Sequence, residues 1–111
     1  SKALENIEKV LETNPNRHFF VRVNSLDNGG IEEIKVLNRF NNLSFRIPKI
    51  EFPEELEIVY KITSKKIGVS IETKESFFNL RNFNHPQIKT LYLGILDLFD
   101  ELHFSHDLIT F

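Results

Sequence analysis

Short runs in which apolar and polar residues alternate constrain the fold of this chain more than any other feature of its sequence. Such alternation is typical of strands that bury one face. Turn signals rich in glycine, asparagine and proline separate the runs, and short connections of this kind favour hairpins. The runs are residues 17–24, 34–40, 43–47, 56–63 and 67–72. We therefore predict an antiparallel meander of about five strands.

Two helices are expected to flank this sheet. Residues 2–13 carry apolar side chains at three- and four-residue spacing and end at Asn14-Pro15. Pro86 is predicted to open a long helix over residues 86–103, because proline is favoured at the first helical position. The predicted fold is therefore α+β, with two layers in which the N-terminal helix and the long C-terminal helix pack on one face of the antiparallel sheet.

The helix expected at residues 86–103 is more apolar than one packed surface requires. Its apolar stripe contains residues at helical spacing, namely Ile88, Leu91, Ile95 and Leu98. Such a helix is either packed on two sides or exposed to a partner, and the partner is either a different protein or a second copy of this chain. A homodimer through this helix is one of the two interpretations.

The composition indicates one domain over residues 1–111. With 41% hydrophobic and 27% charged residues, the chain has the balance of a globular protein. It contains no cysteine, which excludes a disulfide framework, a thiolate zinc site and a cysteine nucleophile. No glycine-rich phosphate loop or dinucleotide motif is present, so we predict no cofactor. No segment has the length and hydropathy of a membrane span, and a small soluble cytoplasmic protein is the default expectation.

Positive charge is concentrated in the first half of the chain, although the formal net charge is −2. Residues 17–50 contain six basic and three acidic residues. If the alternating runs are strands, one sheet face presents basic side chains interleaved with exposed apolar ones and carries no acid at the alternate positions. The candidate partner-binding residues on this face are Phe20, Arg22, Lys35, Leu37, Arg39 and Arg46.

This surface predicts a non-catalytic protein-binding module of the inhibitor, immunity or adaptor type that recognises an acidic partner. Arginine offers paired donors to carboxylates, and an exposed aromatic ring supplies contact area. The same face also fits a nucleic-acid-binding domain, in which Phe20 stacks on bases and the basic side chains contact phosphates. We expect a binding protein in preference to an enzyme.

One catalytic alternative rests on three residues. Pro53-Glu54 before one arm of the expected hairpin, with Glu72-Thr73-Lys74 at the end of the other, resembles the layout of metal-dependent nucleases of the restriction-endonuclease-like superfamily. The resemblance implies that Glu54 and Glu72 hold Mg²⁺ and that Lys74 orients the attacking hydroxide. It covers about twenty residues, and a solvated hairpin is the simpler interpretation.

Histidine and carboxylate side chains also gather near the C-terminus. The group comprises Glu101, His103, His106 and Asp107, which His85 could join. Such residues can bind zinc, but no pair of histidines has helical spacing here. We therefore predict no metal site.

Overall fold

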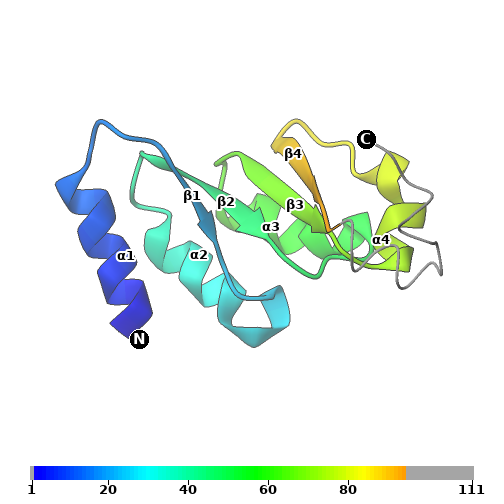
Figure 1. Cartoon of the computed structure of the whole chain (residues 1–111), viewed down its shortest axis with the longest axis horizontal. Coiled ribbons are helices and arrows are strands. Elements are labelled where there is room, and N and C mark those ends of the chain that lie inside the picture. Colours follow the sequence, from blue (N-terminus) through cyan, green and yellow to red (C-terminus); the bar gives the residue numbers. More distant parts are fainter. Residues whose placement is uncertain (1, 95–111) are drawn as a thin grey trace, which may run out of the picture.

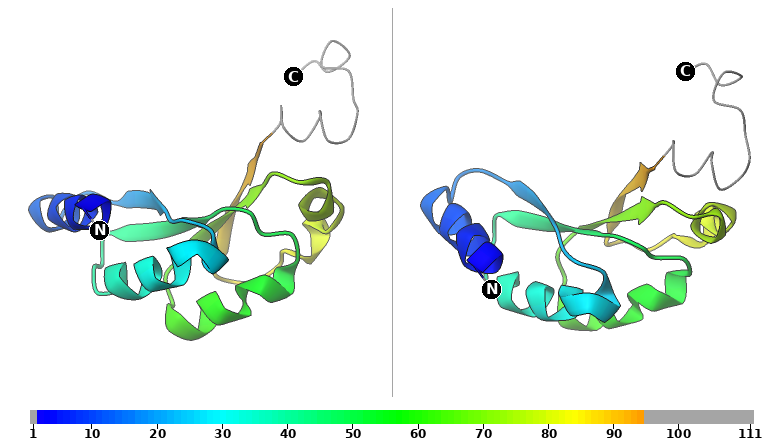
Figure 2. Two further views of the ribbon diagram at one scale, coloured as in Figure 1. Left: turned by 90° about the horizontal axis from the view of Figure 1, so that it is seen from below. Right: turned by 60° about the horizontal axis from the view of Figure 1, so that its bottom comes forward.

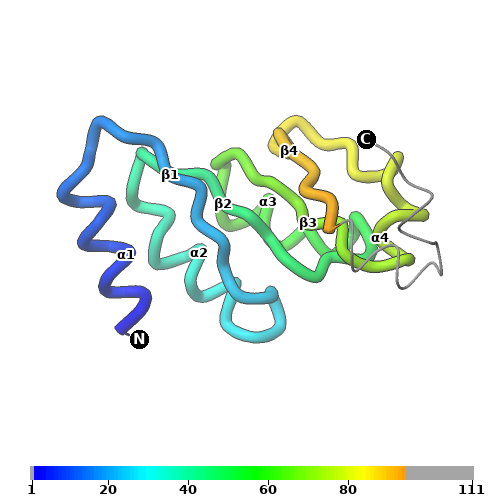
Figure 3. Tube along the Cα trace, viewed as in Figure 1, coloured from blue at the N-terminus to red at the C-terminus, as the bar shows by residue number. Residues whose placement is uncertain are grey.

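A computed structural model describes residues 2–94 and shows an α/β fold with a four-stranded, all-parallel sheet (Figure 1). The strands are β1 (Phe19–Arg22), β2 (Leu43–Ile47), β3 (Ile67–Ile71) and β4 (Ile88–Leu93), and they lie in the sheet in this order. The predicted antiparallel meander is wrong. Helical segments carry the chain back between successive strands, so that each strand runs in the same direction as the last (Figure 3).

Helical segments precede and separate these strands. They are α1 (Lys2–Thr13), η1 (Leu26–Gly30), α2 (Ile31–Leu37), η2 (Pro53–Leu56), α3 (Glu57–Ile62), α4 (Lys74–Phe78) and η3 (Leu80–Asn82). The helix predicted over residues 2–13 is confirmed as α1. The order of the strands in the sheet is the same as their order in the chain. The described residues therefore form consecutive β-α-β units, each of which adds the next parallel strand beside the previous one.

Helix α2 replaces the predicted return arm of a hairpin. Asn28 and Gly29 leave helical geometry, and Gly29 has a φ of 97°, so the predicted chain reversal occurs here. It leads into a helix because Ile34 and Leu37, three residues apart, can then both enter the core, where they are 0% and 1% exposed. Val36, which an alternating strand over residues 34–40 would bury on the same face as Ile34, is 40% exposed.

Helix α3 likewise takes the place of the first arm of the second predicted hairpin. Leu56, Val59 and Thr63 are buried, and their three- and four-residue spacing is that of one helix face. Pro53 starts the preceding η2 segment at a position that tolerates proline, and the Glu55 side chain accepts hydrogen bonds from the backbone N–H groups at this start. The segment therefore forms a helix that buries Leu56, Val59 and Thr63, and not the strand that the alternation of Ile58 with its neighbours predicted.

The core lies between the sheet and one layer of helices. The odd-numbered residues of β1, β2 and β3, including Val21, Phe45 and Val69, pack in one cluster with residues from α1, α2 and α3. Figure 2 shows α2 and α3 side by side beneath the sheet, with α1 and α4 toward its two ends. No helix among residues 2–94 covers the opposite face of the sheet.

The long helix predicted over residues 86–103 is contradicted where the structure describes it. Residues 88–93 form β4, which pairs with β3 in parallel, and residues 95–103 lie outside the described residues. The Gln87 side chain donates to the carbonyl oxygens of Thr63 and Lys65, which fixes the start of β4 beside the loop that precedes β3. The helical surface proposed for a homodimer is therefore absent over residues 88–93.

Within residues 2–94, no helix combines the length and the apolar character that crossing a membrane requires.

Tyr60 of α3 packs flat against His85, with ring centroids 3.7 Å apart and planes inclined by 8°. Burial raises the pKa of the Tyr60 hydroxyl, and the charge of Glu57 raises it further. The folded protein therefore holds this proton more tightly than the unfolded chain does. The stabilisation is complete below the pKa of an unfolded tyrosine, about 10, and is lost as the pH rises through the higher folded pKa.

We expect Tyr60 to ionise at higher pH in the folded protein than in the unfolded chain. The chain has two tyrosines and no tryptophan, so the Tyr92→Phe variant lets an absorbance titration of tyrosinate follow Tyr60 alone. The same variant in urea is the control and should titrate at about pH 10. A folded midpoint equal to or below that of the control would contradict the burial argument.

Candidate ligand-binding face

On the side of the sheet that no helix of residues 2–94 covers lie the even-numbered residues of β1, β2 and β3 together with Thr90 and Tyr92 of β4, and we refer to this side as the open face. Its members follow from the strand register: Phe20 and Arg22 of β1, Ser44 and Arg46 of β2, Gly68 and Ser70 of β3, and Thr90 and Tyr92 of β4. Arg22 and Arg46 are Cα partners on neighbouring strands. Their side chains therefore leave the sheet from adjacent positions.

Arg46 is held against the middle of this face by two contacts. Its Nε donates to the Ser70 Oγ at 3.0 Å, and its guanidinium carbon lies 4.0 Å from the centroid of the Tyr92 ring. Ser70 is 0% exposed although no described helix covers it. Arg46 and Tyr92 thus form the cover over the centre of β3.

Glu72, the residue after β3, lies at the carboxyl end of the same face. Its Oε1 is 3.4 Å from an Arg22 terminal nitrogen, and its Oε2 accepts from the Lys49 backbone N–H at 3.3 Å. The Arg22 side chain is 55% exposed, so this long ion pair contributes little to stability. A groove of about 460 Å³ is lined here by Arg22, Lys49, Glu51, Glu72 and Thr73. The basic face predicted within residues 17–50 carries no acid, and the structure adds Glu72 to it from the end of β3.

The amino-terminal end of the face carries a polar pair and an exposed ring. His18 Nε2 and Ser44 Oγ are 2.8 Å apart, and the His18 ring meets the Phe20 ring edge-on at 5.4 Å. Phe20 is 65% exposed, whereas the core residues of the sheet are buried. The open face therefore combines two guanidinium groups with one free aromatic surface.

The structure divides the six candidate partner-binding residues between two places. Phe20, Arg22 and Arg46 lie on the open face. Lys35 and Leu37 belong to α2 in the helix layer, where Leu37 is 1% exposed. Their assignment to a strand of this face is therefore corrected.

Arg39, the remaining candidate, follows α2 and contacts α1. Its terminal nitrogen lies 2.8 Å from Glu8 and 3.3 Å from Glu12, and these hydrogen bonds raise its pKa. The guanidinium also lies 4.1 Å from the centroid of the Phe40 ring. Arg39 joins α1 to the rest of the helix layer and does not lie on the open face.

Sequence reasoning missed Ser70, Glu72 and Tyr92 as neighbours of the two arginines. Tyr92 was assigned to a helix, and its parity in a strand could not be considered. Ser70 and Glu72 do alternate with core residues in the run 67–72, and that signal placed them on one face. The sequence did not show that the strand carrying Ser70 lies beside the strand carrying Arg46.

The layout that resembled a metal-dependent nuclease loses its hairpin in this structure. Glu54 belongs to η2, Lys74 begins α4, and Glu54 does not line the groove that contains Glu72. Among residues 2–94, no three histidine, aspartate or glutamate side chains form a group that could hold a metal ion. Glu101, His103, His106 and Asp107 lie outside the described residues, and His85 stacks on Tyr60.

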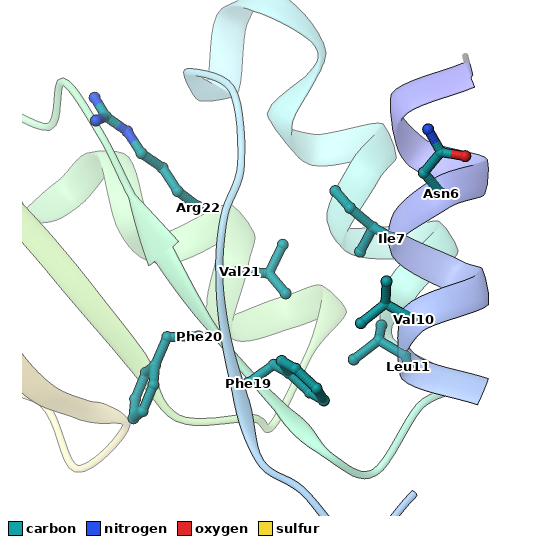
Figure 4. Close-up of a pocket in the computed structure, with 8 residues that line it drawn as sticks. All are labelled: Asn6, Ile7, Val10, Leu11, Phe19, Phe20, Val21 and Arg22. Carbon is teal, nitrogen blue, oxygen red and sulfur yellow. The ribbon is translucent and has the colours of Figure 1, made fainter. Parts of the chain in front are cut away.

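A second concavity separates α1 from β1 (Figure 4). It measures about 340 Å³ and is mostly apolar, with Ile7 and Val10 on one wall and Phe19 and Val21 on the other. Figure 4 shows Phe20 and Arg22 leaving β1 on the side away from α1. Phe20 and Arg22 therefore contribute to the lining of this groove at its edge, while the Arg22 guanidinium points away from α1.

No protein-family model matches this chain, and no curated protein matches it with significance.

Proposed function

We propose that this chain is a non-catalytic protein-binding module that recognises an acidic segment of another protein through the open face. The observation that carries the proposal is the adjacency of Arg22 and Arg46 on β1 and β2, with the exposed ring of Phe20 beside them. Guanidinium groups on a rigid sheet select carboxylates by paired hydrogen bonds, and an aromatic side chain adds contact area.

The contacts of Arg46 support this proposal more strongly than charge alone does. Its bond to Ser70 and its stacking on Tyr92 restrict the side chain before any partner arrives. A restricted side chain loses less conformational entropy on binding than a free one. Arg22 is more exposed, and its single acidic contact at 3.4 Å is one that a partner carboxylate can replace.

Charge reversal on the open face is expected to weaken recognition strongly. A fluorescently labelled glutamate-rich peptide should bind the protein with an affinity that falls as salt rises. Arg22→Glu and Arg46→Glu should each weaken binding by roughly tenfold or more. Fluorescence anisotropy provides the measurement, and circular dichroism verifies that each variant is folded.

Two control variants sharpen this test. Lys35→Glu makes the same change in charge on exposed α2, in the helix layer, and should leave the affinity within about twofold. Glu72→Gln removes the acid already facing Arg22 and should strengthen binding of the same peptide. Equal losses from Lys35→Glu and Arg46→Glu would show that only net charge matters and would refute the proposal.

A labelled single-stranded oligonucleotide tests the competing function on the same surface. Nucleic-acid binding predicts tighter capture of the oligonucleotide than of the peptide, with a steep salt dependence. That result would replace the protein-binding proposal. We expect the reverse order, because the formal charge of the whole chain is −2 and the open face has Glu72 beside Arg22.

A further inference from the structure

The Arg46 side chain presents one defined edge to an incoming ligand. Its Nε is occupied by Ser70 Oγ, and one face of its guanidinium plane is covered by the Tyr92 ring. Within residues 2–94, its two terminal nitrogens have neither a hydrogen bond nor an ion pair. These nitrogens carry the N–H groups that bind two oxygens of one ligand side by side.

Gly68 is part of the reason that this geometry exists. A Cβ at position 68 would overlap the Tyr92 ring, so the absence of a side chain lets that ring lie against β3. Gly68 is also the Cα partner of Arg46 on the neighbouring strand. Gly68, Tyr92 and Ser70 therefore act together as positioning residues for the Arg46 guanidinium.

Once Arg22 turns away from Glu72, the two guanidinium groups offer a ligand two positive charges. Arg22 and Arg46 occupy partner positions on adjacent strands, and Glu72 is the acidic group that contacts either of them among the described residues. Glu72 therefore supplies a counterion to Arg22, and Arg46 has none among the described residues. A phosphate monoester carries close to two negative charges at neutral pH and has three acceptor oxygens, enough to engage both arginines.

We propose that Arg46 and Arg22 form a receptor for a phosphorylated side chain within the acidic segment of the partner protein. This inference rests on the proposed function and specifies the group that the open face recognises. Arg46 contributes the restrained paired donors, and Arg22 turns from Glu72 toward the phosphate. The exposed ring of Phe20 remains available for an apolar residue of the same segment.

Three versions of one short acidic peptide test this receptor by fluorescence anisotropy. The central residue is phosphoserine, glutamate or serine. We expect the phosphoserine peptide to bind at least about tenfold more tightly than the glutamate peptide at pH 7.5. Equal affinities would overturn the phosphate inference, while binding of both acidic peptides would leave the proposed function intact.

The pH dependence supplies a readout that a general charge effect does not produce. The second pKa of phosphoserine is about 6, so the advantage over glutamate should shrink as the pH falls from 7.5 to 5.5. The ionisable and charged groups around this position are Arg22, Arg46, Lys49, Glu51, Glu72, Tyr92 and His18. Any change in their protonation acts on both peptides, and the ratio of the two affinities isolates the phosphate.

Two substitutions separate a positioned guanidinium from a mere positive charge. Arg46→Lys keeps the charge but loses the paired donors, and it should reduce the preference for phosphoserine to about twofold or less. Gly68→Ala should displace the Tyr92 ring and weaken the same preference without touching either arginine. Gly94→Ala, where a Cβ would meet its nearest atoms at 3.5 Å, is the matched control. Retention of the full preference in Arg46→Lys would refute the receptor.

A 5′-phosphorylated oligonucleotide and inorganic phosphate distinguish the sources of the phosphate group. Inorganic phosphate should compete with the phosphoserine peptide only weakly, because it lacks the acidic residues that surround the phosphorylated one. Tighter binding of the oligonucleotide than of the phosphopeptide would overturn the inference in favour of a nucleic-acid ligand. Failure of every acidic peptide to bind would instead reject the proposed function itself.

Discussion

Replacing Gly30 by alanine is expected to lower the free energy of unfolding by about 2–4 kcal/mol. A Cβ at this position would overlap the Asn24 carbonyl oxygen and would lie 2.9 Å from the Ser25 carbonyl oxygen. Both atoms belong to the backbone, so no side-chain rotation relieves the clash. The required space, not an unusual φ, explains this glycine, because its φ is −61°.

The consequences of this clash extend to the core. The Gly30 N–H donates to the Ser25 carbonyl oxygen at 3.0 Å, and α2 begins at the next residue. Moving the backbone here would shift Ile34 and Leu37, which fill the core beneath the sheet. Urea unfolding followed by far-ultraviolet circular dichroism measures the loss.

Gly94→Ala is the matched control for this substitution. Its added Cβ meets the nearest side-chain and backbone atoms of Glu72 at 3.5 and 3.7 Å, which are ordinary contacts. A change within about 0.5 kcal/mol is expected there. Equal effects of the two substitutions would mean that glycine content alone, not the close approach to Asn24, determines the result.

Phe45→Ala is expected to cost about 3–5 kcal/mol, the largest loss for a single truncation among residues 2–94. Phe45 is 0% exposed and lies in β2, between its Cα partners Val21 of β1 and Ile67 of β3. Its removal leaves a cavity bounded by sheet and helices, and neighbouring backbone in paired strands cannot collapse into it. The midpoint of urea unfolding should fall accordingly, with little change in its slope.

Phe20→Ala tests the same chemical change on the other side of the sheet. Phe20 is 65% exposed, so its truncation should cost less than about 1 kcal/mol while weakening capture of an acidic peptide. Comparable destabilisation by the two substitutions would contradict the two-layer arrangement in which the odd-numbered residues of β1 and β2 face the helices and the even-numbered ones do not.

The two hairpins that the sequence predicted show why alternation misled the interpretation. Residues 56–63 contain Leu56, Ile58, Tyr60 and Ile62 at period two, and they also contain Leu56, Val59 and Thr63 at helical spacing. Over so short a segment both periods fit. Burial of the second set against the sheet selected the helix.

The candidate site was anticipated in part for a related reason. Alternation correctly separated Phe20 and Arg22 from Val21, because β1 is a strand. It failed for Lys35 and Leu37, since residues 31–37 are helical and their side chains follow a different period. Tyr92 was missed because the segment from Pro86 was assigned the wrong period.

The sequence by itself determined where the chain changes direction and which strand residues avoid water. The Asp27 to Gly30 turn, the proline before η2 and the parity of Val21, Phe45 and Val69 all belong to local chemistry. Tertiary structure alone decided that the strands run parallel and that Tyr92 joins Arg22 and Arg46 on one face. Strand direction depends on whether each intervening segment can bury a helical face against the sheet, and that free energy exists only once the layers meet.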